Sequence, residues 1–297
     1  MSLKAIVAAL GGELYQGGQR ATVPAPGHSP HDRSISLCLI DDRVLVHSFG
    51  GTHWRDARRD LQARGLVDAG GRLAGVSGKG PTDIGPPASR RRLVAASLWE
   101  AGLPIGDTAP SHRYLARRAV RADADNLRHH PHVPVSVYRP GSFGRAALIA
   151  RISDAADQLT GVELVYLEPN GLPASGLRVP RKTMGQVPPG AAVRLAPAAC
   201  SMLVGEGVCT TLSAMERFGR PGWALRSAHN LAAWSPPPDV EDVLIAGDRG
   251  KVGEAAARCL CQRLVRMGLQ AAVVLPPPSH DDWNDVAVAD ARPRRRE

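Results

Sequence analysis

The sequence M-L-V-G-E-G at residues 202–207 begins a series of three apolar stretches that each end in acidic residues. V-L-I-A-G-D-R-G follows at 243–250, and A-V-V-L-P-P-P-S-H-D-D-W-N-D follows at 272–285. Each stretch has the character of a buried strand. Ligands bind beyond the carboxyl ends of the strands in an open parallel sheet, where carboxylates converge on a divalent cation. The series predicts an α/β domain with an acidic, metal-dependent site.

Helical patterns separate these strands, and Gly219 and Gly268 are the expected helix ends. The expected elements are a strand at 201–205, a helix at 208–218, a strand at 222–226, a short helix near 230–234, a strand at 242–247, a helix at 251–267 and a strand at 271–275. Such alternation predicts a parallel sheet flanked by helices.

The preceding residues predict two smaller α+β units. A hairpin at 34–40 and 43–48 lies between helical segments at 2–14 and 54–64. Short strands are expected at 146–153, 161–167 and 192–195, after helices at 92–101 and 112–118. The predicted division is an N-terminal domain at 1–68, a flexible linker at 69–92, an α+β region at 93–197, the parallel-sheet domain at 198–290 and a basic tail at 291–297.

The composition is strongly basic. The 37 Lys and Arg residues give a net charge of +9, and most of them are Arg. Arg binds phosphate through a planar fork of donors, so nucleic acid is the first candidate partner. A coding bias that enriches Arg, Ala, Gly and Pro together is the alternative explanation for this charge.

The five cysteines form no C-x-x-C pair, and we interpret them as reduced thiols of a cytoplasmic protein. No apolar run approaches the eighteen or so residues that a membrane helix needs. We therefore expect no membrane partner.

The C-terminal part resembles the Toprim domain of bacterial-type primases, topoisomerases and some nucleases. The whole chain resembles phage- and plasmid-associated primase-like proteins. Toprim domains carry a glutamate after the first strand and Asp-x-Asp after a later one; Glu206 and Asp248 stand at the first two of these positions. D-W-N-D at 282–285 resembles an Asn-Asp element of these relatives. L-T-G-V-E-L-V-Y-L at 159–167 and R-K-T-M-G at 181–185 resemble the segments that precede the domain.

Two acids of the Toprim pattern are replaced in this chain. Gly250 stands where the second aspartate of Asp-x-Asp is expected. Cys209 stands where the relatives often carry an acid, three residues after the glutamate. These replacements put the strength of catalysis in doubt.

The N-terminal domain resembles a zinc ribbon that has lost its ligands. A-P-G-H at 25–28 replaces Cys-Pro-x-His, and S-F-G-G at 48–51 lies near the expected Cys-x-x-Cys, so only His28 remains. Zinc sites need tightly spaced ligand pairs, and His28 and His31 form one such pair without a second. Surface histidines are therefore expected rather than a zinc site. The other candidate ligands are Cys38, His47 and His53.

The resemblance implies Mg²⁺ or Mn²⁺ held by Asp248 and one of Asp282 and Asp285. It also implies that Glu206 activates or orients an attacking 3′-hydroxyl. Taken singly, Glu206 and Asp248 are better explained as acids at helix starts. Acids at three strand ends of one domain favour a shared site.

Phosphate contacts are expected from two kinds of residue. Gly205 and Gly207 have no side chain to keep a phosphate away. Arg181 and Lys182 are the basic pair just before the domain, and the other basic clusters are interpreted as solvated faces. A dinucleotide site is disfavoured, because three prolines follow strand 271–275 where an acid would hold the ribose. No G-x-x-x-x-G-K-[ST] is present, so any helicase motor belongs to another chain.

The function that fits these features is primer synthesis on single-stranded DNA from nucleoside triphosphates, alongside a separate replicative helicase. One alternative is a nucleic-acid-binding accessory protein with weakened catalysis. The other is a metal-dependent Toprim nuclease.

Overall fold

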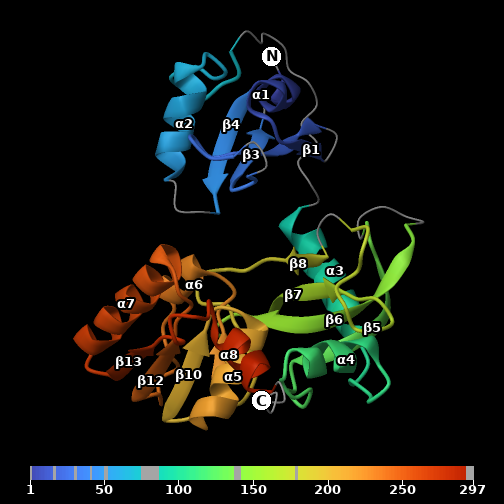
Figure 1. The fold of residues 1–297 in the computed structure, drawn as a ribbon, viewed down its shortest axis with the longest axis vertical. Coiled ribbons are helices and arrows are strands. Elements are labelled where there is room, and N and C mark those ends of the chain that lie inside the picture. Colours follow the sequence, from blue (N-terminus) through green and yellow to red (C-terminus); the bar gives the residue numbers. More distant parts are fainter. Residues whose placement is uncertain are drawn as a thin grey trace, which may run out of the picture. The chain divides into compact units, whose positions relative to one another are not determined.

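The chain folds into two compact units, Met1–Gly85 and Pro86–Glu297 (Figure 1). The computed structural model describes residues 2–15, 18–29, 32–40, 42–49, 53–74, 87–136, 142–177 and 180–291. The middle of the predicted linker, 75–86, and the tail residues 292–297 lie outside the described residues. At the described ends of that linker, Leu73 is buried and residues 88–92 are helical.

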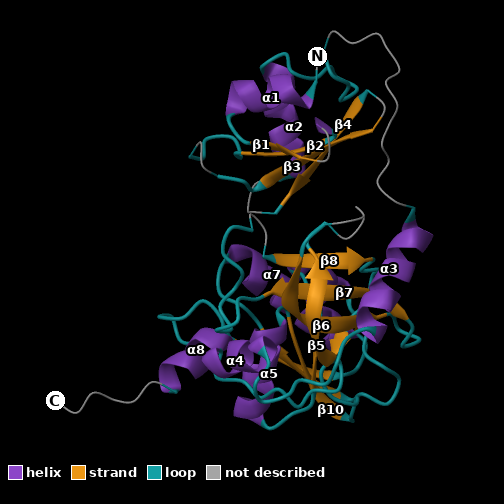
Figure 2. Ribbon diagram, turned by 90° about the vertical axis from the view of Figure 1, so that its right-hand side faces the viewer, coloured by secondary structure: helices purple, strands orange, loops and turns teal. Residues whose placement is uncertain are grey.

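The N-terminal unit is a four-stranded antiparallel sheet packed against two helices (Figure 2). Ile35 and Leu37 alternate along β3 and contribute to one core with Leu3 of α1 and Leu61 of α2. The elements are α1 (Leu3–Leu10), β1 (Glu13–Tyr15), β2 (Arg20–Val23), β3 (Ile35–Ile40), β4 (Arg43–Ser48) and α2 (Trp54–Ala63). The predicted hairpin is present as β3 and β4.

The first helix is shorter than the predicted 2–14. It ends at Leu10 because Gly11 and Gly12 take φ values of 77° and 126°. A Cβ at Gly12 would lie 2.2 Å from the carbonyl oxygen of Thr22, so the chain passes close to β2 here. Residues 13–15 then pair with β2 as a strand.

His28 pairs with an acid in this unit. Its Nδ1 lies 3.3 Å from Oδ2 of Asp32. The same carboxylate accepts hydrogen bonds from the hydroxyl of Ser34 and the backbone N–H of Ala25, and these bonds lower the pKa of Asp32. Hydrogen bonds thus organise the segment where the resemblance implies a metal ligand. His31 lies outside the described residues.

The second unit begins with an antiparallel sheet that is covered on both faces. Ala95 and Leu98 of α3 share a core with Leu164 of β7, whereas Leu115 of α4 shares a different core with Val165. The elements are α3 (Ala88–Glu100), α4 (Pro110–Arg117), β5 (Leu127–Pro134), β6 (Gly144–Ser153), β7 (Leu159–Tyr166) and β8 (Arg181–Gly185), with the strands in sequence order. Because both faces are covered, β7 is buried along nearly its whole length.

The sequence does not predict β5. Its residues, L-R-H-H-P-H-V-P, combine prolines and histidines, which are uncommon in strands. The strand forms at the sheet edge, and its pairing with β6 shifts between His130 and Val133, on either side of Pro131. An edge position and an irregular register accommodate a proline that lacks a backbone donor.

The predicted C-terminal α/β arrangement is confirmed. The sheet has the order β13-β12-β10-β11-β9, in which all neighbours are parallel except β11 and β9. The strands are β9 (Val193–Arg194), β10 (Ser201–Gly205), β11 (Gly222–Ala224), β12 (Asp242–Ala246) and β13 (Gln270–Val274). The helices are α5 (Val208–Phe218), α6 (Ala228–Ala233), α7 (Lys251–Arg266) and α8 (Trp283–Asp290). Gly219 ends α5 in the left-handed conformation, with φ 63°.

Alternate residues of β12 point to opposite faces of this sheet and contact different helices. Val243 and Ile245 share a core with residues of α6 and α7. Leu244 packs with Ala214 of α5 and Val286 of α8. Helix α8, which the sequence does not predict, thereby completes one layer.

The two sheets of the second unit share a hydrophobic core. Leu148 of β6 and Val165 of β7 belong to the same cluster as Val208 and Leu212 of α5. Strand β9 extends the parallel sheet by pairing with β11. The antiparallel and parallel sheets are therefore parts of one packed body.

No helix within the described residues is both long enough and apolar enough to cross a membrane.

Candidate active site

Glu206 and Asp248 follow neighbouring parallel strands. Gly205, the last residue of β10, pairs with Ala246, the last residue of β12. The chain leaves β10 toward β11 on one side, while β12 lies on the other. Strand order reverses at this point, which is where open parallel sheets bind ligands. The fold thus places both acids at the edge that the sequence predicts.

The carboxyl group of Asp248 is the most perturbed group of this edge. Burial raises its pKa to about 7, and the nearby charges of Glu206, Asp282 and Asp285 add to the rise. Its Oδ1 is buried and has no hydrogen-bond partner. A carboxylate in this environment is poorly stabilised unless a cation or a proton joins it.

Glu206 is also held away from water. Burial raises the pKa of its carboxyl group, while the backbone N–H of Ala228 and the guanidinium of Arg181 oppose this rise. Its backbone carbonyl accepts a hydrogen bond of 2.8 Å from the N–H of Arg226. The glutamate therefore has defined neighbours on both its main chain and its side chain.

The acids after β13 are brought to this edge by backbone contacts. The N–H of Arg249 donates to the carbonyl of Asp281 at 2.8 Å. Asp282 caps α8 by accepting from the N–H of Asp285, and its other oxygen lies 3.1 Å from Oγ1 of Thr210. Asp285 is exposed. The predicted acids thus gather around Asp248, although Asp282 also serves as a helix cap.

The middle residues of D-W-N-D are structural. Trp283 is buried against Phe218, with ring centroids 5.0 Å apart. The amide of Asn284 donates to the backbone carbonyl of Arg118 at 2.6 Å and to Oγ of Ser213 at 2.9 Å. This motif therefore anchors α8 and presents its acids.

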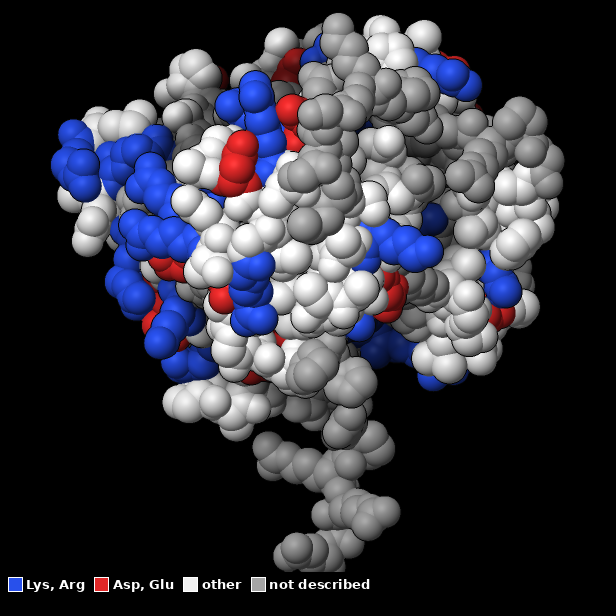
Figure 3. Space-filling model, turned by 90° about the horizontal axis from the view of Figure 1, so that it is seen from above, with Lys and Arg blue, Asp and Glu red and all other residues white. Residues whose placement is uncertain are grey.

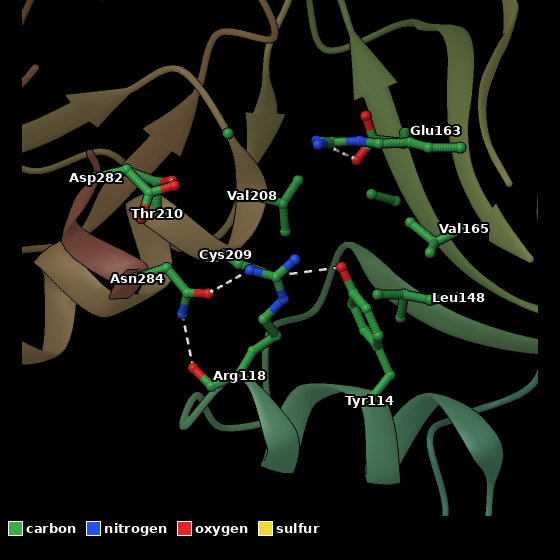
Figure 4. Close-up of a pocket in the computed structure, with 13 residues that line it drawn as sticks. Tyr114, Arg118, Leu148, Glu163, Val165, Val208, Cys209, Thr210, Asp282 and Asn284 are labelled. Atoms are coloured by element: carbon green, nitrogen blue, oxygen red, sulfur yellow. Dashed lines mark hydrogen bonds and ion pairs between the residues drawn. The ribbon is translucent and has the colours of Figure 1, made fainter. Parts of the chain in front are cut away.

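A pocket of about 100 Å³ adjoins the acids, between the two sheets of the second unit (Figure 4). Figure 4 shows Asp282 and Thr210 on one side, Glu163 on the other, and Tyr114 of α4 below with Arg118, the residue after that helix. Arg181 and Cys209 also line it. Burial raises the pKa of the Cys209 thiol, so an apolar thiol occupies the position where relatives often carry an acid.

The structure separates the predicted phosphate contacts Arg181 and Lys182. Successive side chains of a strand point to opposite faces, and only Arg181 reaches the pocket. Lys182 donates to the carbonyl of Val135 at 2.9 Å and lies over the ring of Tyr166. Burial lowers its pKa. Its amine is therefore engaged away from the pocket, and a phosphate contact by Lys182 stays a prediction.

The two predicted phosphate-binding glycines also differ. Gly205 is buried, and a Cβ there would lie 2.6 Å from Oγ1 of Thr211, so close packing explains this glycine. Gly207 lines the pocket and precedes α5.

Two further glycines shape the turn after Asp248. Gly250 takes φ 105°, which is strained for any other residue. A Cβ at Gly253 would lie 2.6 Å from the carbonyl oxygen of Asp248, so the first turn of α7 packs closely against the backbone of this aspartate.

The oxygen donors at this edge suit a hard divalent cation. The unpartnered oxygen and raised pKa of Asp248 fit a bound cation. Among the described residues, no three His, Cys, Asp or Glu side chains are close enough together to hold a metal ion as they stand. As the side chains stand, a cation at this edge would therefore be held by fewer than three of them, with water or substrate oxygens as its other ligands.

The sequence gives little indication of three other residues near the pocket, Tyr114, Arg118 and Arg226. Glu163 has one detectable signal, because it is a lone acid inside the apolar run of β7. A buried acid of this kind needs a cationic partner, and Glu163 has two in Arg181 and Arg226.

Residues 201–292 match the sequence profile of the Toprim domain. The chain contains a Toprim domain. The acids at the ends of β10 and β12 and the segment that carries α8 all lie within this match. Residues 89–195, which include α3, α4 and the antiparallel sheet, match a domain of unknown function (DUF7146).

Several solved structures are similar to the chain. The primase fragment of the bacteriophage T7 primase-helicase protein is 13% identical, with a TM-score of 0.42, over 86% of this chain and 87% of that one. The Aquifex aeolicus primase, with its zinc-binding and RNA polymerase domains, is 12% identical, with a TM-score of 0.46, over 97% and 79%. A DNA primase domain from Pseudomonas aeruginosa is 13% identical, with a TM-score of 0.46, over 68% and 75%. No curated protein matches the chain.

Proposed function

We propose that the chain is a primase-like nucleotidyltransferase that makes short primers on single-stranded DNA. One observation carries this proposal: the buried carboxyl group of Asp248, with its unpartnered oxygen, lies among Glu206, Asp282 and Asp285 in a Toprim domain. Such a cluster is costly to keep ionised, and a divalent cation would offset that cost.

Asp248, with Asp282 or Asp285, would hold the cation, Mg²⁺ or Mn²⁺. When bound, the cation would neutralise charge on the triphosphate. Glu206 would accept the proton of the attacking 3′-hydroxyl, a role favoured by its raised pKa. The domain would mainly position the reactants and neutralise charge, as in phosphoryl transfer generally.

Arginines beside the acids would bind the phosphates. Arg118 and Arg181 line the pocket next to Asp282. Lys and Arg side chains are also prominent on the face shown in Figure 3, and the net charge of +9 favours single-stranded DNA as the template. A replicative helicase is the further partner that we propose, since the residues given hold no G-x-x-x-x-G-K-[ST] motor motif.

Gly250 favours a second candidate, a nucleic-acid-binding accessory protein with weakened catalysis. It stands at an expected acid position, and its φ of 105° excludes a simple return to aspartate.

The deciding experiment supplies single-stranded DNA, ribo- or deoxyribonucleoside triphosphates, and Mg²⁺ or Mn²⁺. We expect labelled oligonucleotides from the wild type and from Asp239→Asn, a control at an exposed aspartate of the same domain. Glu206→Gln and Asp248→Asn should each lose at least about 100-fold in rate. Absence of product with retained, salt-sensitive DNA binding would establish the accessory role, and shortened DNA would establish a nuclease.

A further inference from the structure

Glu163 is shared by two arginines that differ in burial. Its Oε1 lies 2.9 Å from Nη2 of Arg181, and its Oε2 forms an ion pair with Arg226. Only 4% of the Glu163 side chain and 9% of the Arg226 side chain are exposed, whereas 53% of Arg181 is exposed. The carboxylate therefore has one buried cation and one that reaches solvent.

Arg226 is fixed in its position. Its backbone takes φ 72°, a left-handed conformation that non-glycine residues rarely adopt, and its N–H donates to the carbonyl of Glu206. The next residue, Ser227, caps α6. Burial lowers the pKa of Arg226 to about 10, so the guanidinium stays charged at neutral pH. Separating it from Glu163 would leave an unpaired charge in the interior.

Arg181 has the freedom that Arg226 lacks. It belongs to β8, lines the pocket and influences the charge of Glu206. When its guanidinium turns from Glu163 to an anion in the pocket, Glu163 keeps the partner that is buried with it. Arginine suits this exchange because its planar fork binds carboxylate and phosphate in the same way.

We propose that Arg226 is the permanent counter-ion of Glu163 and thereby leaves Arg181 available to bind a polyphosphate in the pocket. This inference rests on the proposed function, in which the polyphosphate belongs to a nucleoside triphosphate. Arg226 is a positioning residue, since it acts through Glu163 on Arg181. Without Arg226, Glu163 would hold Arg181 as its sole partner.

Binding of inorganic tripolyphosphate by the full chain tests this directly, measured by calorimetry without divalent cations. Arg181→Met and Arg226→Gly should each weaken binding about five-fold, and Glu163→Gln should tighten it by a similar factor. Glycine accepts the left-handed backbone at 226. Glu168→Gln is the matched control, because Glu168 pairs with Arg145 and does not line the pocket. It should bind as the wild type does.

The proposed role predicts weaker binding in Arg226→Gly and tighter binding in Glu163→Gln. Structural damage would instead weaken binding in every variant. Glu163→Gln leaves Arg226 unpaired and can fail to fold. The double variant Glu163→Gln with Arg226→Gly contains neither buried charge, and we expect it to bind at least as tightly as the wild type. Wild-type affinity in Arg226→Gly, or weaker binding in the folded double variant, would overturn the proposal. The binding assay does not require primer synthesis. If the affinities follow the expected order but the chain makes no primers, only the proposed function is contradicted.

Discussion

Asn284 and Arg118 hold each other through reciprocal hydrogen bonds. Nδ2 of Asn284 donates to the backbone carbonyl of Arg118 at 2.6 Å, and the guanidinium of Arg118 donates to Oδ1 of Asn284 at 3.1 Å. The pair joins the end of α4 to the first turn of α8. It thus links the DUF7146 match to the segment that presents Asp282 and Asp285.

Asn284→Ala should destabilise the second unit by about 1–3 kcal/mol, because it leaves the partly buried carbonyl of Arg118 and the buried hydroxyl of Ser213 without their donor. Urea unfolding followed by circular dichroism measures this free energy. Gln262→Ala, which removes an exposed amide from α7, should change it by less than about 0.5 kcal/mol. If the two substitutions changed the unfolding free energy equally, the Asn284–Arg118 hydrogen bonds would contribute no more to stability than an exposed side chain does.

The stability of Asp248→Asn relative to that of the wild type should increase with pH. The folded pKa of about 7 exceeds the ordinary value of 3.8, so the folded state binds the proton more tightly than the unfolded state. Asp248 therefore costs stability as pH rises from about 4 to about 7, and the deficit persists above that range. Without metal at pH 8, Asp248→Asn should be more stable than the wild type by about 1–2 kcal/mol.

Thermal unfolding in chelator across pH 4–8 measures this difference. The two proteins should converge at the acidic end, and Asp239→Asn should follow the wild type throughout. A wild type that equals or exceeds Asp248→Asn at pH 8 would contradict the assignment of Asp248 as a destabilised carboxylate.

Divalent cations should stabilise the wild type more strongly as pH rises through about 7, because the cation competes with the proton on Asp248. Calorimetric titration of Mg²⁺ at pH 7, in buffers with different ionisation enthalpies, should detect released protons. In Asp248→Asn, the increase in melting temperature that Mg²⁺ causes should be mostly lost, and it should no longer depend on pH. An undiminished shift in that variant would place the cation elsewhere.

Gly250→Asp should not simply supply a missing ligand. The φ of 105° strains any side chain, so Gly250→Asp and Gly250→Ala should each cost about 1–3 kcal/mol in unfolding free energy. Gly207 is the control glycine at the same sheet edge, because its φ is −91° and a Cβ there would meet only the side chain of Thr210, with Oγ1 at 3.4 Å and Cβ at 3.8 Å. Gly207→Ala should therefore be the least destabilising of the three substitutions. Full stability of Gly250→Asp would show that the turn adapts.

The C-terminal sheet could be predicted because its signals are local. Apolar runs, helical spacing and the closing Gly219 determine β10, α5 and β12 within a few residues of each segment. Parallel strands bring their carboxyl ends together, so the gathering of Glu206 and Asp248 follows from the pattern alone.

The remaining features depend on contacts between distant parts of the chain. Strand β5 forms at an edge against β6 in spite of its prolines, and α8 is secured by Asn284 and Trp283. The exchange of Arg181 between Glu163 and the pocket has no local signal, because β8 aims one basic side chain inward and its neighbour outward. Glu163, a lone acid in an apolar strand, is the one residue of this group whose sequence context could have indicated a buried cationic partner, a signal that our sequence-based predictions did not use.

The core that joins β6 and β7 to α5 has a consequence for how this protein can be recombined. Leu148 and Val165 come from one family match and Val208 and Leu212 from the other, so a chimera joined near residue 197 would pair mismatched surfaces. Productive chimeras should instead be joined near residue 86, between the two compact units. Substitutions on either side of this core should accordingly be inherited together, with each segment constraining which versions of the other it tolerates.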